Sequence, residues 1–182
     1  MAKKIVVLNG SPRPNGNTAG LIAAFTEGAK TAGHSVTAFP LQSMRIGGCI
    51  GCLQGGKDPA SPCVQKDDMD KIYPAFVEAD IVVFASPLYY WTISGQLKCT
   101  LDRLFAVAEC DPNYENPKKD CVLLMAAEGD GYAEVTMWYD NLMKYLNWTD
   151  LGKVLAGGVM KVGDIAGKPV LDEARKLGAG IA

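Results

Sequence analysis

The sequence alternates between short apolar runs and longer segments in which apolar residues recur every three or four positions. Five apolar runs have the length and β-branched content of buried strands, at residues 4–8, 35–41, 79–85, 121–127 and 151–160. Helical spacing follows them, at residues 18–30, from 67 onwards, and at 93–108, 135–145 and 171–181. Strands that alternate with helices are joined by right-handed crossovers. The pattern therefore predicts an α/β fold, a doubly wound five-stranded parallel sheet.

Residues 42–66 interrupt this alternation. They are rich in Gly, Cys, Pro and Ser and show no hydrophobic period, so we expect a long loop, and such loops in compact domains are usually functional. The sequence contains no repeat, low-complexity tract or linker. Its 182 residues suit one domain, which we expect to span residues 1–182.

Composition and charge narrow the class of function. Apolar residues make up 48% and charged residues 21%, as in an ordinary globular domain. The net charge of −2 offers no basic surface for nucleic acid. No apolar run approaches the roughly 18 residues that span a membrane, and the run Ile5–Leu8 is too short for a signal peptide. We therefore expect a cytoplasmic protein, in which six cysteines favour thiol, metal or redox roles over disulfides.

A glycine-rich turn, Asn9–Thr18, joins the first expected strand to the first expected helix. Ligands of doubly wound sheets bind beyond the carboxyl ends of the strands. Backbone N–H groups at the helix start, with the hydroxyls of Ser11 and Thr18, the Asn17 amide and the charge of Arg13, would surround a phosphate monoester. The turn lacks both G-x-x-x-x-G-K-[ST] and G-x-G-x-x-G, which disfavours Mg-nucleotide hydrolysis and a tightly held dinucleotide.

Three successive aromatic residues, Tyr89, Tyr90 and Trp91, follow the third expected strand. Aromatic faces stack on flat ring systems, and backbone N–H groups of such a loop can reach ring carbonyls. The alternative is that the aromatic side chains brace the loop against the core. Three in a row cannot all point inward, so we expect at least one to face a ligand or solvent.

These motifs, Asn9-GSPRPNGN-Thr18, Cys49-x-x-Cys52, Asp67-Asp-Met69 and Ser86-PLYYWTISGQL-Lys98, occur in the order found in the NADPH-dependent FMN reductase family. The chain resembles that family over nearly its whole length, and most of all its branch related to iron–sulfur flavoproteins. The resemblance implies a flavodoxin-like fold with strand order 2-1-3-4-5, FMN as cofactor, NAD(P)H as reductant, and a homodimer or homotetramer.

The resemblance also implies roles for individual residues. The FMN phosphate would be held by Ser11, Arg13, Asn15, Asn17 and Thr18. The isoalloxazine ring would be lined by Pro87, Leu88, Tyr89, Tyr90, Trp91 and Ser94, with Ala127, Glu128 and Gly129 facing its other edge.

The cysteines of the long loop leave several interpretations open. Iron–sulfur flavoproteins carry four close cysteines there, enough to ligate a [4Fe–4S] cluster. In this chain Cys49, Cys52 and Cys63 are only three, and Gly55 stands roughly where a further one would fall. The candidate roles are an incomplete cluster site, zinc with Asp58 or Asp67 as fourth ligand, a reversible Cys49–Cys52 dithiol, and simple packing.

No acid–base pair is evident near the expected pocket, and the one histidine, His34, is expected at the surface. Flavin chemistry needs few protein groups because the cofactor carries the difficult step. We therefore expect an oxidoreductase that passes electrons from NAD(P)H through FMN to a small acceptor, such as a quinone, free flavin, or a nitro- or azo-aromatic. The alternatives are an electron-transfer flavoprotein reduced by a protein partner and a binding module that has lost its flavin.

Overall fold

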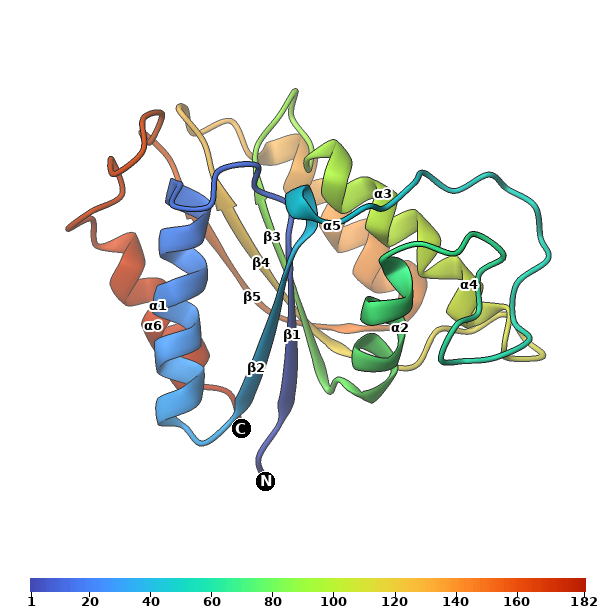
Figure 1. The fold of residues 1–182 in the computed structure, drawn as a ribbon. Coiled ribbons are helices and arrows are strands. Elements are labelled where there is room, and N and C mark those ends of the chain that lie inside the picture. The colour runs from blue at the N-terminus through green and yellow to red at the C-terminus, as the bar shows by residue number, and fades with distance from the viewer.

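The computed structural model describes residues 1–182 and contains one parallel sheet flanked by helices (Figure 1). The strands are β1 (Lys4–Asn9), β2 (Ser35–Pro40), β3 (Ile81–Pro87), β4 (Asp120–Ala126) and β5 (Thr149–Ala156). They pair in the order β2-β1-β3-β4-β5, and every pairing is parallel. The predicted doubly wound, flavodoxin-like sheet is confirmed.

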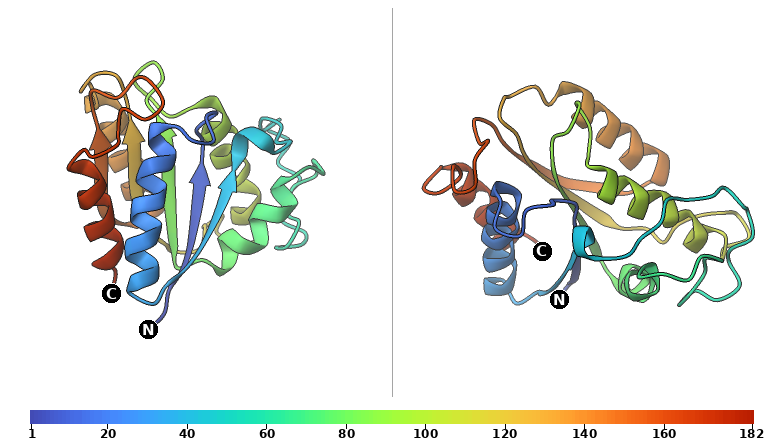
Figure 2. Two further views of the ribbon diagram at one scale, coloured as in Figure 1. Left: turned by 60° about the vertical axis from the view of Figure 1, so that its left-hand side comes forward. Right: turned by 45° about the horizontal axis from the view of Figure 1, so that its top comes forward.

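The helices cover both faces of this sheet. They are α1 (Asn17–Thr31), the short 3₁₀ helix η1 (Leu41–Ser43), α2 (Met69–Glu78), α3 (Gly95–Arg103), α4 (Phe105–Ala108), α5 (Ala133–Leu146) and α6 (Val170–Ala179). Helices α1 and α6 lie side by side on one face, and α2, α3, α4 and α5 lie on the other (Figures 1 and 2).

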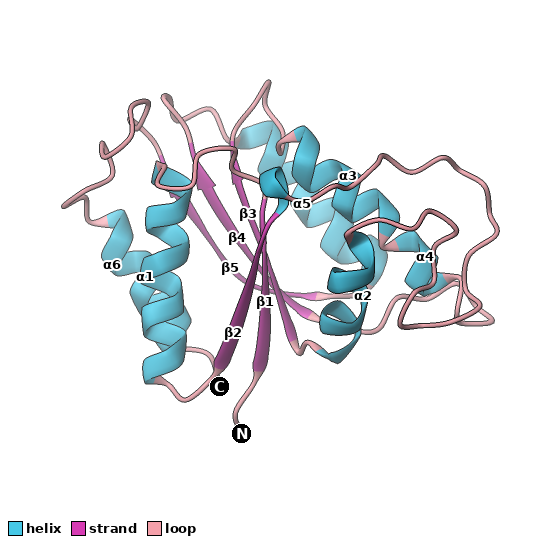
Figure 3. Ribbon diagram, viewed as in Figure 1, coloured by secondary structure: helices cyan, strands magenta, loops and turns pink.

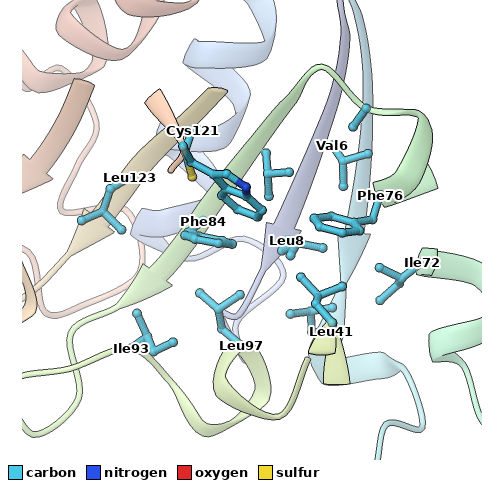
Figure 4. Close-up of a cluster of buried hydrophobic side chains, with 14 of the residues drawn as sticks. Val6, Leu8, Leu41, Ile72, Phe76, Phe84, Ile93, Leu97, Cys121 and Leu123 are labelled. Carbon is cyan, nitrogen blue, oxygen red and sulfur yellow. The ribbon is translucent and has the colours of Figure 1, made fainter. Parts of the chain in front are cut away.

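Each strand supplies side chains to two hydrophobic cores because successive side chains point to opposite faces. In β1, Val6 and Leu8 join the core beneath α2, α3 and α5, whereas Ile5 and Val7 join the core beneath α1 and α6. Figure 4 shows the first of these cores, in which Phe76 of α2 packs close to Leu8. Burial on both faces explains why the strands are continuous apolar runs rather than alternating ones.

The structure departs from the predicted elements most clearly at β5 and at the helix predicted over residues 93–108. Strand β5 stops at Ala156 rather than Met160, because the chain turns at Gly157 and Gly158, where φ reaches +66° at Gly158. The helix predicted at residues 93–108 is divided into α3 and α4 at Leu104, whose N–H bonds to the carbonyl three residues back, as in a 3₁₀ turn. Both breaks fall inside apolar runs, where hydrophobic spacing gives no signal of a boundary.

The predicted surface position of His34 is wrong. The side chain is 7% exposed, its Nδ1 accepts a hydrogen bond from the Lys3 N–H (3.1 Å), and its Nε2 lies 3.0 Å from the Ile181 carbonyl oxygen. The segment after α6 covers the ring, a long-range contact that the local pattern around His34 does not report.

The loops that follow β1, β3, β4 and β5 gather at one edge of the sheet (Figure 3). All strands are parallel, so their carboxyl ends meet there, and this edge is where ligands bind in open α/β sheets. No helix of the structure has the length and apolar character needed to cross a membrane.

Candidate functional site

A polar cavity of about 270 Å³ opens at the carboxyl edge of the sheet. The turn after β1, the start of α1, and the loops after β3, β4 and β5 all contribute to its wall. Its lining residues are Ser11, Arg13, Gly16, Asn17, Thr18, Pro87, Leu88, Tyr89, Ala126, Ala127, Glu128, Val159 and Met160.

The turn at this cavity is shaped by its own side chains. The Ser11 N–H donates to Asn9 Oδ1 (3.0 Å), the Arg13 N–H donates to Ser11 Oγ (3.3 Å), and the Gly16 N–H donates to the Arg13 carbonyl (3.1 Å). No side chain caps the N-terminus of α1, and its first turn carries no acidic residue. The N–H groups and positive dipole end of α1 therefore face the cavity free of a competing anion, which suits a phosphate group.

A second, mainly apolar cavity of about 490 Å³ adjoins the first. The two cavities share Leu88, Tyr89, Ala127 and Glu128 as walls. The remaining residues around the second cavity are Tyr90, Trp91, Gly129 and Gly131.

The aromatic residues stand on a tight hairpin. The Tyr89 N–H donates to the Thr92 carbonyl (3.0 Å) and the Thr92 N–H returns a bond to the Tyr89 carbonyl (3.1 Å). This two-residue turn forces Tyr90 and Trp91 to positive φ values of 46° and 62°. Bulky residues rarely adopt that conformation, and such strain concentrates at functional sites. Tyr90 and Trp91 are 93% and 59% exposed, so they project from the protein rather than brace it.

Ser94 connects the aromatic loop to the glycine-rich turn. Its buried hydroxyl donates to the Gly10 carbonyl (2.8 Å) and accepts from the Leu97 N–H (3.3 Å), which caps α3. Its own N–H donates to Ser86 Oγ (2.9 Å). A Cβ at residue 10 would lie 2.5 Å from Ser94 Oγ, so only glycine permits this contact.

The structure gathers most of the predicted site residues around the two cavities. Two of them lie elsewhere: Asn15 is exposed and lines neither cavity, and Ser94 is fully buried beneath the loop. Sequence reasoning missed Gly131, Val159 and Met160. The signal for the last two was the pair Gly157–Gly158, which ends β5 and sends the following loop to the same edge of the sheet.

Residues 44–68, which we term the cysteine loop, do not present a ligand set for a metal. No group of three or more His, Cys, Asp or Glu side chains in the structure could hold a metal ion. Cys49 is exposed, Cys63 is buried, and with Cys52 they line only a narrow cavity of about 40 Å³. A [4Fe–4S] cluster needs four ligands, so the residues present do not fit one. Neither do they fit zinc, because neither Asp58 nor Asp67 lines this cavity with the cysteines, and the Asp67 carboxylate is already paired with Arg103.

The two adjoining cavities do fit FMN. A phosphate would meet the uncapped N-terminus of α1 and the Thr18 hydroxyl, while a flat ring would enter between Leu88, Tyr89 and Ala127. The polar cavity would take the phosphate end of FMN, and the adjoining apolar cavity would take its aromatic ring.

Comparison with known proteins agrees with this geometry. Archaeoglobus fulgidus has an iron–sulfur flavoprotein that is 30% identical over 179 residues, which cover 98% of this chain and 79% of that protein. An iron–sulfur flavoprotein of Methanocaldococcus jannaschii is 33% identical over 100 residues, and only 55% of this chain and 51% of that protein align.

Among solved structures, the fold is similar to that of the NAD(P)H:quinone oxidoreductase from Methanothermobacter marburgensis. The TM-score is 0.76 at 21% identity, over 98% of this chain and 96% of the other. The sequence model of the NADPH-dependent FMN reductase family matches residues 3–159, which include the glycine-rich turn, the cysteine loop and the aromatic hairpin. The chain therefore belongs to the NADPH-dependent FMN reductase family.

Proposed function

We propose that this protein is an FMN-dependent oxidoreductase that takes electrons from NAD(P)H and passes them to a small aromatic acceptor, such as a quinone, free flavin, or a nitro- or azo-aromatic. The observation that carries the proposal is the pairing of two cavities with shared walls. One ends at the uncapped α1 N-terminus, and the other opens beneath exposed aromatic side chains.

Bound FMN would supply a ring that accepts a hydride and gives up electrons again. The protein's contribution is to bind and orient. The N–H groups of α1 and the side chains of Ser11 and Thr18 would hold the phosphate, and Leu88 and Ala127 would fix the plane of the ring. Tyr90 and Trp91 would stack on the nicotinamide or the acceptor in turn.

The proposal is tested by adding FMN to the purified chain and following reduction near 450 nm (about the usual flavin maximum) under anaerobic conditions. We expect rapid bleaching by NADPH or NADH, and rapid recovery of colour when 1,4-naphthoquinone is added. A chain that takes up no FMN contradicts the proposal.

The names of the iron–sulfur flavoproteins above favour a second candidate, an electron-transfer flavoprotein. The rate of anaerobic flavin reduction, followed by the same absorbance measurement, separates the two candidate functions. Slow bleaching by both nicotinamides, together with fast bleaching by a reduced ferredoxin, would support the electron-transfer role and overturn the nicotinamide-dependent one.

We also propose that the protein is a homodimer or homotetramer whose partner subunit approaches the aromatic hairpin. Large exposed aromatic residues such as Tyr90 are typical of protein–protein or ligand contacts. Sedimentation velocity of the wild type and of Tyr90→Ser tests this. A monomeric wild type contradicts the proposal, and a smaller assembly in the variant supports it.

A further inference from the structure

The loop that follows β5, residues 157–169, packs against the glycine-rich turn and the first turn of α1 (Figures 1 and 2). We term it the β5 loop. Its residues Val159 and Met160 form part of the polar cavity wall. The family likeness matches residues only up to 159, so most of this loop lies beyond the matched segment.

Asn17 fastens the β5 loop with both ends of its amide. Its Nδ2 donates to the Lys161 carbonyl (2.9 Å), and its Oδ1 accepts from the Ile165 N–H (3.2 Å). Asn17 is 7% exposed, and Ile165 is buried in the core beneath α1. Both ends of the Asn17 amide are therefore bonded to the loop, in addition to the phosphate role that the family resemblance implies for this residue.

A second contact reaches the loop from the turn. Arg13 Nη1 donates to the Met160 carbonyl (2.8 Å), which holds the guanidinium at the rim of the polar cavity. The positions of Arg13 and of the β5 loop are therefore linked, because a shift of Met160 removes the acceptor that orients Arg13.

Asp164 holds the loop from within. Its Oδ2 accepts hydrogen bonds from the N–H groups of Met160 (2.9 Å) and Lys161 (2.7 Å). These are the residues whose carbonyls meet Arg13 and Asn17. Hydrogen bonds from the Lys161 and Met160 N–H groups keep the pKa of Asp164 below its usual range, so the carboxylate is charged at neutral pH. Asp164 does not line the cavity itself.

We propose that Asn17 and Asp164 are positioning residues for the cofactor: they hold the β5 loop as the outer wall of the phosphate end and thereby set the affinity for the phosphate group. The inference rests on the proposed function, because the cavity must hold FMN. Asp164 acts only through Met160 and Lys161, whereas Asn17 lines the cavity and also holds the loop through Lys161 and Ile165.

The experiment compares FMN with riboflavin, which has the same ring but no phosphate. Both affinities are measured by flavin fluorescence quenching for the wild type, Asp164→Asn, Asn17→Ala and the control Asp172→Asn, which removes an exposed carboxylate on α6. In Asp164→Asn and Asn17→Ala we expect FMN to bind about tenfold more weakly and riboflavin to change by less than about twofold. The control should change neither affinity.

The direction of the effect separates positioning from simple electrostatics. If Asp164 acted only through its negative charge, Asp164→Asn would strengthen the binding of the FMN dianion rather than weaken it. Stronger or unchanged FMN binding in this variant overturns the proposal, and so does an equal loss for FMN and riboflavin, which would indicate general unfolding.

Amide hydrogen exchange on the flavin-free chain gives a second readout. We expect faster exchange at Met160 and Lys161 in Asp164→Asn, with strand β1 unchanged. Unaltered exchange at both amides would contradict the positioning role. If the wild type binds neither FMN nor riboflavin, the proposed function is overturned together with this role. If the wild type binds FMN and the two variants bind it with the same affinity, this role alone is overturned.

Discussion

Arg103 and Asp67 form a buried, two-pronged ion pair that joins α3 to the end of the cysteine loop. Arg103 Nη1 lies 2.8 Å from Asp67 Oδ2, and Nη2 lies 3.2 Å from Oδ1. The guanidinium also donates to the carbonyls of Gly47 (3.0 Å) and Gln65 (3.2 Å), at opposite ends of the same loop. The cysteine loop has no group of side chains that could hold a metal ion, and the buried guanidinium of Arg103 fixes its two ends instead.

Removing this cation should destabilise the protein strongly. The two side chains are 1% and 11% exposed, so Arg103→Gln would leave a buried carboxylate without its partner, at a cost of about 3–5 kcal/mol in the free energy of unfolding. Urea unfolding measures this cost. The matched control is Lys98→Gln, which breaks the exposed pair with Asp102 and should cost less than about 1 kcal/mol. Similar losses in the two variants would contradict the role we give to burial.

The same pair makes stability depend on pH. Burial opposes ionisation of Asp67, but hydrogen bonds from Arg103 and from the Gly47 and Met69 N–H groups outweigh it, so the pKa of Asp67 lies below its usual range. A carboxyl group with a lowered folded-state pKa stabilises the protein above its unfolded value of about 3.9, and this contribution is lost as the pH falls through the folded value. We therefore expect the urea concentration at the unfolding midpoint to fall as the pH is lowered below about 4. In Asp67→Asn the midpoint should fall less steeply over the same pH range. An equally steep fall in that variant would assign the dependence to other carboxylates.

Much of the fold follows from local sequence pattern, because strands buried on both faces must be apolar throughout and helices must show one apolar face. What the pattern cannot report is contact between distant residues. The neighbours of His34 in the sequence indicate a surface turn, because the residue that covers it, Ile181, is 147 positions away. The hydrophobic pattern also does not predict the end of β5. Val159 and Met160 continue the apolar run of the sequence, but the strand itself ends before Gly157.

The candidate site was predicted where chemistry and position in the fold coincide. Ser11 and Thr18 follow β1 directly, and Tyr89 follows β3, so parallel strand order alone brings them together. The second role of Asn17 was hidden, because its partners Lys161 and Ile165 come from a loop with no motif. Ser94 likewise belongs to the aromatic motif but serves as a buried link.

A close helix crossing provides a test of packing. A Cβ at Gly178 of α6 would lie 2.2 Å from the Phe25 carbonyl oxygen of α1, so the two backbones meet where only glycine fits. Alanine gains about 1 kcal/mol as a helix former, but forcing the helices apart should cost about 1–3 kcal/mol. We expect thermal unfolding of Gly178→Ala at a lower temperature than the wild type. Gly95→Ala, where the added carbon meets nothing within 4 Å, should be neutral or stabilising.

Ser94→Ala should disturb both halves of the site at once. The substitution leaves the Gly10 carbonyl without its buried donor and removes the cap of α3, which together should cost about 1–3 kcal/mol in unfolding free energy. FMN should also bind more weakly, because the turn and the aromatic loop lose their link. Ser43→Ala, which removes an exposed hydroxyl bond to the Pro40 carbonyl, is the control and should leave FMN affinity unchanged. Wild-type affinity in Ser94→Ala would show that the two segments hold their positions independently.

The aromatic hairpin should trade stability for activity. Tyr90 and Trp91 occupy left-handed conformations that cost about 1 kcal/mol or more each, whereas Asn-Gly is the preferred pair for such a turn. The double variant Tyr90→Asn, Trp91→Gly should therefore unfold at a higher temperature than the wild type. It should also reduce 1,4-naphthoquinone about tenfold less efficiently in the oxidative half-reaction, because the exposed stacking surface is gone. Thermal unfolding and stopped-flow oxidation of the reduced protein measure the two effects separately. A variant that is more stable and fully active would show that the strained aromatic residues serve neither acceptor binding nor the fold.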